Sequence, residues 1–252
     1  MVDSETEIEF KDGLVSFFKT THSIPESMGV VIGTDKGNIV YTGDFKFDQA
    51  AREGYQTDLL RLAEIGKEGV LALLSDSANA TSNDQIASES EVGEEMDSVI
   101  ADADGRVIVA AVASNLVRIQ QVFDSAVAYG RRVVLTGTDV ENIIRTALRL
   151  KKLMITDERL LIKPRDMAKF EDHESIILES GRMGEPINSL QKMAAGRHRY
   201  VQIKEGDLVY IVTTPSTAKE AMVARVENLI YKAGGSVKLL SLIHISEPTR
   251  LG

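Results

Sequence analysis

Cysteine is absent from the 252 residues, which excludes disulfide bonds and thiolate metal sites together. A metal ion would therefore have to be held by histidine and carboxylate side chains. The chain also lacks an apolar run long enough to span a bilayer, and its first residues do not resemble a signal peptide. With 43% hydrophobic residues, it can bury the core of one or two domains. These features predict a cytoplasmic protein with no membrane partner.

Basic residues are outnumbered by acidic ones, and the net charge is -9. A protein that holds nucleic acid presents positive charge to the phosphates, so this balance argues against an RNA partner unless basic residues gather locally. Each candidate group below is, on its own, more often an ordinary solvated surface. The groups are Arg131 with Arg132, residues 145–152, residues 163–165, and Lys192 with Arg197 and Arg199.

Residues 14–48 predict strands that deliver a histidine and a carboxylate to one place. Alternating apolar residues on both sides of Asp35-Lys36-Gly37 favour two strands joined by a hairpin turn. Strand pairing would then bring His22 and Asp44 to the same end of a sheet. An imidazole and a carboxylate are usual ligands of a divalent metal in hydrolases. From residue type alone, however, two unrelated surface residues are the more common explanation.

A second carboxylate follows the apolar run at residues 70–74, which is typical of a buried parallel strand. Since α/β proteins place their chemistry beyond the carboxyl ends of such strands, Asp76 is a candidate site residue. On spacing alone, an aspartate in a turn or at a helix N-cap is the more common role.

Strands and helices alternate regularly after the Ser- and Asn-rich residues 80–90, which mark a crossing into a second domain. This alternation predicts an α/β unit with an open, mainly parallel sheet flanked by helices. The expected helices lie at residues 89–102, 115–128, 140–150, 186–195 and 219–233, and the expected strands at residues 107–112, 132–135, 175–178, 208–212 and 237–240.

Two strand-to-helix junctions of this unit are candidate phosphate-binding turns. Ser114 and Asn115 precede a helix whose first amide groups can hold a phosphate, although a simple N-cap is favoured by sequence alone. Gly181 and Gly184 lie in the SGRMGEP junction at residues 180–186. That signal is weak, because glycines are common in such turns.

Five motifs in a fixed order resemble the ribonuclease J family of metallo-β-lactamase-fold, β-CASP ribonucleases, over residues 7 to about 240. They are THSIPES, VYTGDFKFD, GVLALLSDSANA, RVIVAAVASNLVRIQQV and GEPINSLQKMAAGRHR. The resemblance implies part of a metallo-β-lactamase αββα domain at residues 1–85 and a β-CASP domain at residues 86–241. Residues 242–252 instead resemble translated sequencing-adapter sequence, so His244 is not counted as a ligand.

The resemblance implies a metal-dependent ribonuclease with 5′-3′ exonuclease and endonuclease activity in RNA processing and mRNA decay. His22 would bind one of two divalent metal ions, zinc or manganese, and Asp44 would bridge both. Asp76 would orient a ligand histidine or move a proton. The junction residues Ser114, Asn115, Gly181 and Gly184 would contact single-stranded RNA. The implied protein partner is a second copy of the chain or a ribonuclease J paralogue.

The chain departs from the family pattern in ways that leave other functions open. The His-x-His-x-Asp-His run of the family is missing, which predicts an interior fragment that is inactive alone. Met183, Ala218 and Ala78 also stand where the family's loops have other residues. Such loops suit a weakly active paralogue that supports a partner ribonuclease J in a complex. A small-molecule hydrolase of the same fold is a further alternative.

Overall fold

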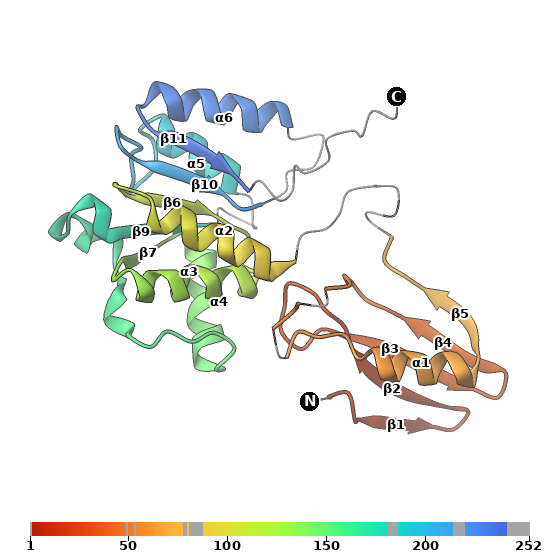
Figure 1. Cartoon of the computed structure of the whole chain (residues 1–252). Coiled ribbons are helices and arrows are strands. Elements are labelled where there is room, and N and C mark those ends of the chain that lie inside the picture. Colours follow the sequence, from red (N-terminus) through yellow and green to blue (C-terminus); the bar gives the residue numbers. More distant parts are fainter. Residues whose placement is uncertain are drawn as a thin grey trace. The chain divides into compact units, whose positions relative to one another are not determined.

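The computed structural model describes residues 2–48, 50–52, 54–77, 80, 88–180, 186–213 and 220–240. The chain divides into two compact units, shown in Figure 1 and described separately below. Unit 1 comprises residues 1–84 with 88–90, and unit 2 comprises residues 85–87 with 91–252. Among the helices of the described ranges, none is long and apolar enough to cross a membrane.

Unit 1 contains a five-stranded sheet in the order β1-β2-β3-β4-β5. Its first four strands pair antiparallel, whereas β4 and β5 pair parallel. Residues 35 and 36 form the turn between β3 and β4, which confirms the predicted hairpin. The strands are β1 (Glu7–Phe10), β2 (Gly13–Lys19), β3 (Met28–Thr34), β4 (Gly37–Tyr41) and β5 (Val70–Leu74).

A small core forms where helix α1 (Leu59–Glu68) packs against one face of this sheet. The helix begins at Asp58, whose carboxylate accepts a hydrogen bond from the amide of Arg61 and so satisfies one free N–H group of the first turn. The fully buried members of the core are Phe18, Val31, Val40 and Ile65.

The prediction that residues 70–74 form a buried strand is correct for the parallel pairing and wrong for the burial. All five residues of β5 are exposed, including Leu73 at 63% and Leu71 at 58%. The reason is position: β5 is an edge strand with β4 as its neighbour, and α1 packs against the central strands instead. Apolar composition alone does not tell whether other chain segments cover a strand.

Unit 2 contains a six-stranded sheet in the order β11-β10-β6-β9-β7-β8, and every pairing in it is parallel. This confirms the predicted parallel sheet. The strands are β6 (Val107–Ala110), β7 (Arg132–Thr136), β8 (Leu161–Ile162), β9 (Ser175–Glu179), β10 (Leu208–Ile211) and β11 (Ser236–Leu239).

Helices cover both faces of this second sheet, with α2, α3 and α4 on one face and α5 and α6 on the other (Figure 1). The helices are α2 (Glu89–Ala101), α3 (Leu116–Ala128), α4 (Thr138–Arg149), α5 (Pro186–Ala194) and α6 (Glu220–Lys232). The sequence did not predict three short 3-10 helices and β8, which lie between α4 and β9. These 3-10 helices are η1 (Glu158–Leu160), η2 (Pro164–Lys169) and η3 (Asp172–Glu174).

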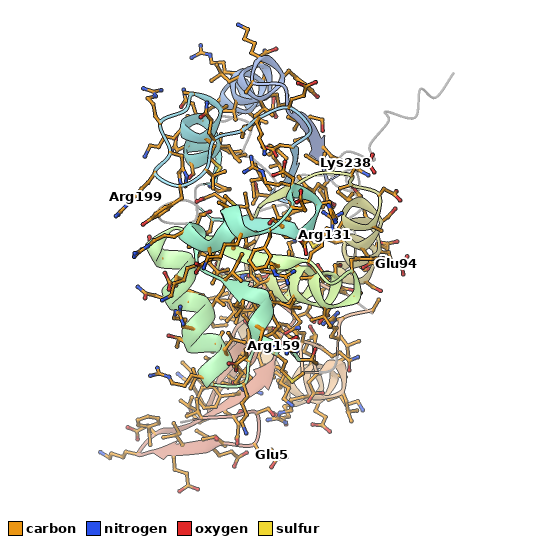
Figure 2. All side chains as sticks on the ribbon, turned by 90° about the vertical axis from the view of Figure 1, so that its left-hand side faces the viewer. Glu5, Glu94, Arg131, Arg159, Arg199 and Lys238 are labelled. Atoms are coloured by element: carbon orange, nitrogen blue, oxygen red, sulfur yellow. The ribbon has the colours of Figure 1, made fainter. Side chains whose placement is uncertain are left out.

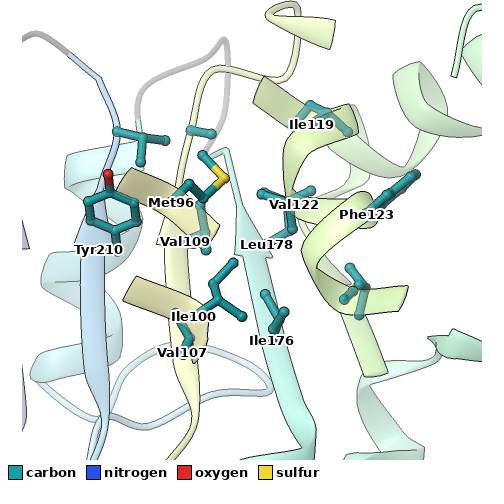
Figure 3. Close-up of a cluster of buried hydrophobic side chains, with 14 of the residues drawn as sticks. Met96, Ile100, Val107, Val109, Ile119, Val122, Phe123, Ile176, Leu178 and Tyr210 are labelled. Atoms are coloured by element: carbon teal, nitrogen blue, oxygen red, sulfur yellow. The ribbon is translucent and has the colours of Figure 1, made fainter. Parts of the chain in front are cut away.

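The two core layers explain why the strands of unit 2 are apolar without alternation. In β6, Val107 and Val109 face the layer of α2 and α3, whereas Ile108 and Ala110 face the layer of α5 and α6. Figure 3 shows the first layer, where Met96 and Ile100 of α2 lie beside Val109 and Val107 of β6. Because both faces of β6 are buried, all four of its residues carry apolar side chains.

A buried ion pair joins the beginnings of β6 and β10. The Arg106 guanidinium donates from Nε to Asp207 Oδ1 at 2.8 Å and from Nη2 to Oδ2 at 2.6 Å. The side chains of Arg106 and Asp207 are only 8% and 1% exposed. Arg106 also donates to the carbonyl of Gln202, so the pair satisfies several polar groups that the sheet would otherwise bury alone.

Candidate active-site corner and nucleic-acid interface

The candidate site of unit 1 lies at one edge of its sheet because three strands end there. β2 and β4 are both antiparallel to β3, so they run in the same direction, and β5 is parallel to β4. Their carboxyl ends therefore meet at one edge. His22, Asp44 and Asp76 follow β2, β4 and β5 by two or three residues each.

His22 and Asp44 lie together at this edge, as the strand pairing predicted. His22 Nε2 is 3.7 Å from Asp44 Oδ2, and the two side chains are 32% and 74% exposed. Main-chain contacts hold the two segments in place, since the amide of Lys46 donates to the carbonyl of Thr21 at 2.9 Å. The amide of Thr21 in turn donates to the Thr57 hydroxyl at 2.9 Å.

Asp76 is tied to the same corner through Thr42. The Asp76 amide donates to Thr42 Oγ1 at 3.1 Å, and the Thr42 amide donates to the carbonyl of Leu74 at 3.0 Å. These bonds hold the backbone of Asp76 beside Thr42, which precedes Asp44 by two positions in the sequence. The roles of His22, Asp44 and Asp76 stay predictions, but the structure brings their segments together.

The described residues supply fewer ligands than a divalent metal requires. A catalytic zinc site typically uses about three protein ligands. The described ranges contain no group of three or more His, Cys, Asp or Glu side chains that could hold an ion. His22 and Asp44 supply two ligands of suitable chemistry. The described residues therefore do not fit a complete metal site.

The starts of the two predicted phosphate-binding junctions, at Ala113 and Ser180, lie close together because β6 and β9 are neighbours. The amide of Ala113 donates to the hydroxyl of the buried Ser180 at 2.9 Å. Ser114 is exposed, whereas the Asn115 side chain accepts from the Arg118 amide at 3.2 Å and so caps α3. The N-cap role is therefore present at Asn115. Gly181 and Gly184 lie outside the described residues.

One of the four basic groups has a structural role. Arg131 is buried, and its guanidinium donates to the carbonyls of Ala103 and Gly105. Burial lowers the pKa of Arg131 from its ordinary value. Arg132 lies over the Phe170 ring at 4.0 Å and pairs with Glu174 at 3.1 Å. These contacts occupy both arginines within unit 2.

Members of the other three basic groups converge on one cavity, which the sequence did not predict. The cavity has a volume of about 740 Å³ and lies beyond the carboxyl ends of β7 and β8. Arg145, Lys163, Arg165 and Arg199 contribute to its lining. The only signal in the sequence was the spacing of the basic groups, and that spacing did not show that they would meet.

The mixed sheet of unit 1, the parallel sheet of unit 2 and the match described next make this an α/β protein with the β-CASP domain of the metallo-β-lactamase family. Residues 104–230 match the family described as "Ribonuclease J, beta-CASP domain". The chain belongs to the ribonuclease J family.

Similar proteins agree with this assignment. The chain is 93% identical over 241 residues to Ribonuclease J 2 of Streptococcus pyogenes serotype M3, with 96% of this chain and 44% of the relative covered. It is 40% identical over 236 residues to Ribonuclease J2 of Bacillus subtilis strain 168, with 94% of this chain and 42% of the relative covered. The chain thus spans less than half the length of these relatives.

One solved structure shows the same fold. It is the crystal structure of a protein of unknown function from Enterococcus faecalis V583, with a TM-score of 0.66 and 14% sequence identity. The likeness covers 95% of this chain and 54% of the other. At this identity it speaks for the fold alone.

Proposed function

We propose that this chain is part of a metal-dependent ribonuclease that cuts single-stranded RNA, both within the strand and from a 5′-monophosphate end. The observation that carries the proposal is the His22–Asp44 pair, 3.7 Å apart at the strand edge of a ribonuclease J family member. This ribonuclease acts in RNA processing and mRNA decay in the cytoplasm, where its RNA substrates are found.

Within this proposal, His22 and Asp44 contribute part of the ligand set for zinc or manganese, and Asp76 is a positioning residue. The described residues hold fewer ligands than a complete site needs. We therefore expect the chain to be inactive alone. A cleavage assay with 5′-monophosphorylated single-stranded RNA and added Zn²⁺ or Mn²⁺ tests this. Turnover that EDTA abolishes would contradict it.

A chimera tests the roles of the site residues. Residues 7–240 of this chain replace the matching segment of the Streptococcus pyogenes relative, which is 93% identical. Asp44→Asn and His22→Ala should each lower RNA cleavage by at least about 100-fold, since loss of a ligand or its support commonly costs metal affinity or activity by 10–100-fold or more. His173→Ala is the matched control, because this histidine is exposed in unit 2. Equal activity of all three variants would refute the assigned roles.

A second candidate function is a structural paralogue that supports a partner ribonuclease J. It is favoured by the similarity to proteins named Ribonuclease J 2 and by the departures at Met183, Ala218 and Ala78. In that case the unmutated chimera would cut RNA poorly but would co-purify with a ribonuclease J paralogue expressed beside it. The relatives' names give no support to a small-molecule hydrolase.

A further inference from the structure

The cavity beyond β7 and β8 has the location and the lining of a ligand site. The carboxyl ends of parallel strands are where open α/β sheets bind ligands. At about 740 Å³, the cavity lies within the range of small-molecule sites, roughly 300–1,000 Å³. Its apolar surface comes from β7, α4 and β8 through the partly exposed Leu135, Leu148 and Leu161. Such a surface suits a flat, weakly polar group such as a nucleobase.

Positive charge is concentrated around this apolar surface although the whole chain carries a net charge of -9. Four cationic side chains line the cavity against two carboxylates, Glu141 and Glu158. Arg145 pairs with Glu141 at 2.8 Å. Among the described residues, no salt bridge within 4.0 Å holds Lys163, Arg165 or Arg199, although the charges of Lys163 and Arg165 help to lower the pKa of the nearby Asp166. All three are exposed, so they can approach phosphate oxygens.

An aromatic ring completes the lining. Tyr200 is 40% exposed, and the Arg199 guanidinium lies 5.0 Å from the centre of its ring. Figure 2 shows Arg199 extending outward from the loop that follows α5. An exposed aromatic ring beside arginine is the usual platform on which single-stranded nucleic acids stack a base.

The loop that carries Arg199 and Tyr200 is held in place by contacts of His198. His198 Nδ1 accepts a hydrogen bond from the Val201 amide at 3.1 Å, and its Nε2 lies 3.7 Å from Glu179 Oε2. Glu179, only 1% exposed, accepts a hydrogen bond from the Thr136 hydroxyl at 2.6 Å. These contacts connect the loop to the ends of β9 and β7, so the platform is part of the folded unit.

We propose that this cavity binds a nucleotide unit of single-stranded RNA, with a base against Tyr200 and the apolar lining and the flanking phosphates at Arg199, Lys163 and Arg165. The proposal rests on the proposed function only in taking RNA as the ligand. It assigns RNA binding to a site in unit 2 that is formed by α4, by β8 with η2, and by the loop after α5.

Fluorescence anisotropy with a fluorescein-labelled decauridylate tests the proposal on the 252-residue chain at about 50 mM salt. The double variant Lys163→Glu/Arg199→Glu should raise the Kd at least tenfold and reduce the magnitude of the slope of log K against log salt by about 1.4, the loss of two phosphate contacts on a single strand. Tyr200→Ala should raise the Kd about fivefold or more, as expected for the loss of one stacked base, and Tyr200→Phe should bind like the unmutated chain.

The matched control is Arg225→Glu/Lys232→Glu, which makes the same charge change at two exposed positions of α6. It should raise the Kd less than threefold. An equal loss in both double variants would show that only net charge matters and would overturn the proposal. Absence of any RNA binding by the unmutated chain would also overturn it. The proposed function has a separate test, because the chimera's cleavage at His22 and Asp44 does not depend on this result.

Crosslinking locates the strand independently of mutation. RNA with a single 4-thiouridine, irradiated on the unmutated chain, should attach to the peptide that contains Tyr200. Attachment only to peptides of unit 1 or of α6 would overturn the proposal. Circular dichroism of each variant, matched to the unmutated chain, ensures that weaker binding reflects the cavity and not unfolding.

Discussion

Strands β5 and β9 are both five residues long and apolar, yet their environments are opposite. β5, VLALL, is exposed at every position, whereas β9, SIILE, is buried at every position. β9 lies between β6 and β7 with helices on both faces, and β5 is an edge strand. The more apolar strand is therefore the exposed one. Burial is decided by neighbouring segments and not by the strand's own composition.

The same contrast extends to the units as wholes. In unit 1 the buried cluster is built around Phe18, Val31, Val40 and Ile65, beneath a single helix. In unit 2 two large clusters fill both sides of the sheet. Buried apolar area is the main source of folding free energy. Unit 2 should therefore be the more stable unit, and hydrogen-exchange mass spectrometry can follow each unit through its own peptides.

The largest expected effect comes from breaking the ion pair in unit 2. Asp207→Ala removes the carboxylate that accepts two hydrogen bonds from the Arg106 guanidinium, which is only 8% exposed, and leaves it Asp172 at 3.9 Å. Removal of one partner of a buried pair costs about 3–5 kcal/mol. Exchange should accelerate in the peptides of β6 and β10 and stay unchanged in β2 and β3. The matched control is Asp166→Ala, which removes the partner of the exposed Lys169 and should have a much smaller effect, because water screens an ion pair at the surface. Equal effects of the two substitutions would show that the buried pair matters no more than an ion pair at the surface, and faster exchange in β2 and β3 as well would contradict the separation of the units.

A smaller effect is expected from filling the one glycine position in unit 1 that touches the core. A Cβ on Gly29 would lie 2.1 Å from Cζ of Phe18. Gly29→Ala should therefore destabilise unit 1 by about 1–3 kcal/mol, the usual cost of overpacking. Chemical denaturation measures the change, and the added variant Phe18→Leu should recover part of it. If Gly29→Ala alone were neutral, the packing of β2 on β3 would differ from the structure.

A glycine substitution in helix α1 should instead stabilise unit 1. Gly66 lies in α1, and a Cβ there would meet nothing within 4 Å. Gly66→Ala should stabilise unit 1 by about 0.5–1 kcal/mol, because alanine restricts the unfolded chain and favours the helix. Slower exchange in the α1 peptide, with unit 2 unchanged, is the expected readout. Faster exchange in this peptide would show that position 66 does not have the open, helical environment that the structure gives it.

Local patterns predicted the elements of unit 2 well. In α2 the sequence spacing predicted a buried face, and Val92, Met96, Val99 and Ile100 are its buried residues. Helical periodicity is local, so it is visible in sequence. The 3-10 helices between residues 158 and 174 were missed, because turns of three to six residues leave no periodic signal.

The candidate sites divide in the same way. The approach of His22 and Asp44 followed from strand direction, which a hairpin fixes locally. The cavity did not follow, because Arg145, Lys163 and Arg199 come from segments whose meeting depends on the order of strands in the sheet. Arg131 shows the reverse case. Its charge made it a candidate RNA contact, but its guanidinium is buried and donates hydrogen bonds to carbonyl groups of residues far away in the sequence.

The smallest expected effect is a pH dependence in the loop that carries Arg199 and Tyr200. Burial lowers the pKa of His198 below its ordinary value of 6.5, while Glu179 opposes the shift and Lys192 adds to it. Since the unfolded state then binds the proton more readily, the contribution of His198 is complete above pH 6.5 and is lost as the pH falls below that value.

The unmutated chain and His198→Gln should therefore differ less in unfolding free energy at pH 5.5 than at pH 7.5. His173→Gln, at an exposed histidine of unit 2, should leave the difference between the two pH values unchanged. Other carboxylates titrate in all three proteins, so their contribution cancels in the comparison. If His198→Gln ran parallel to the unmutated chain, His198 would be as accessible to protons in the folded state as in the unfolded state, and the anchored loop would be the wrong description.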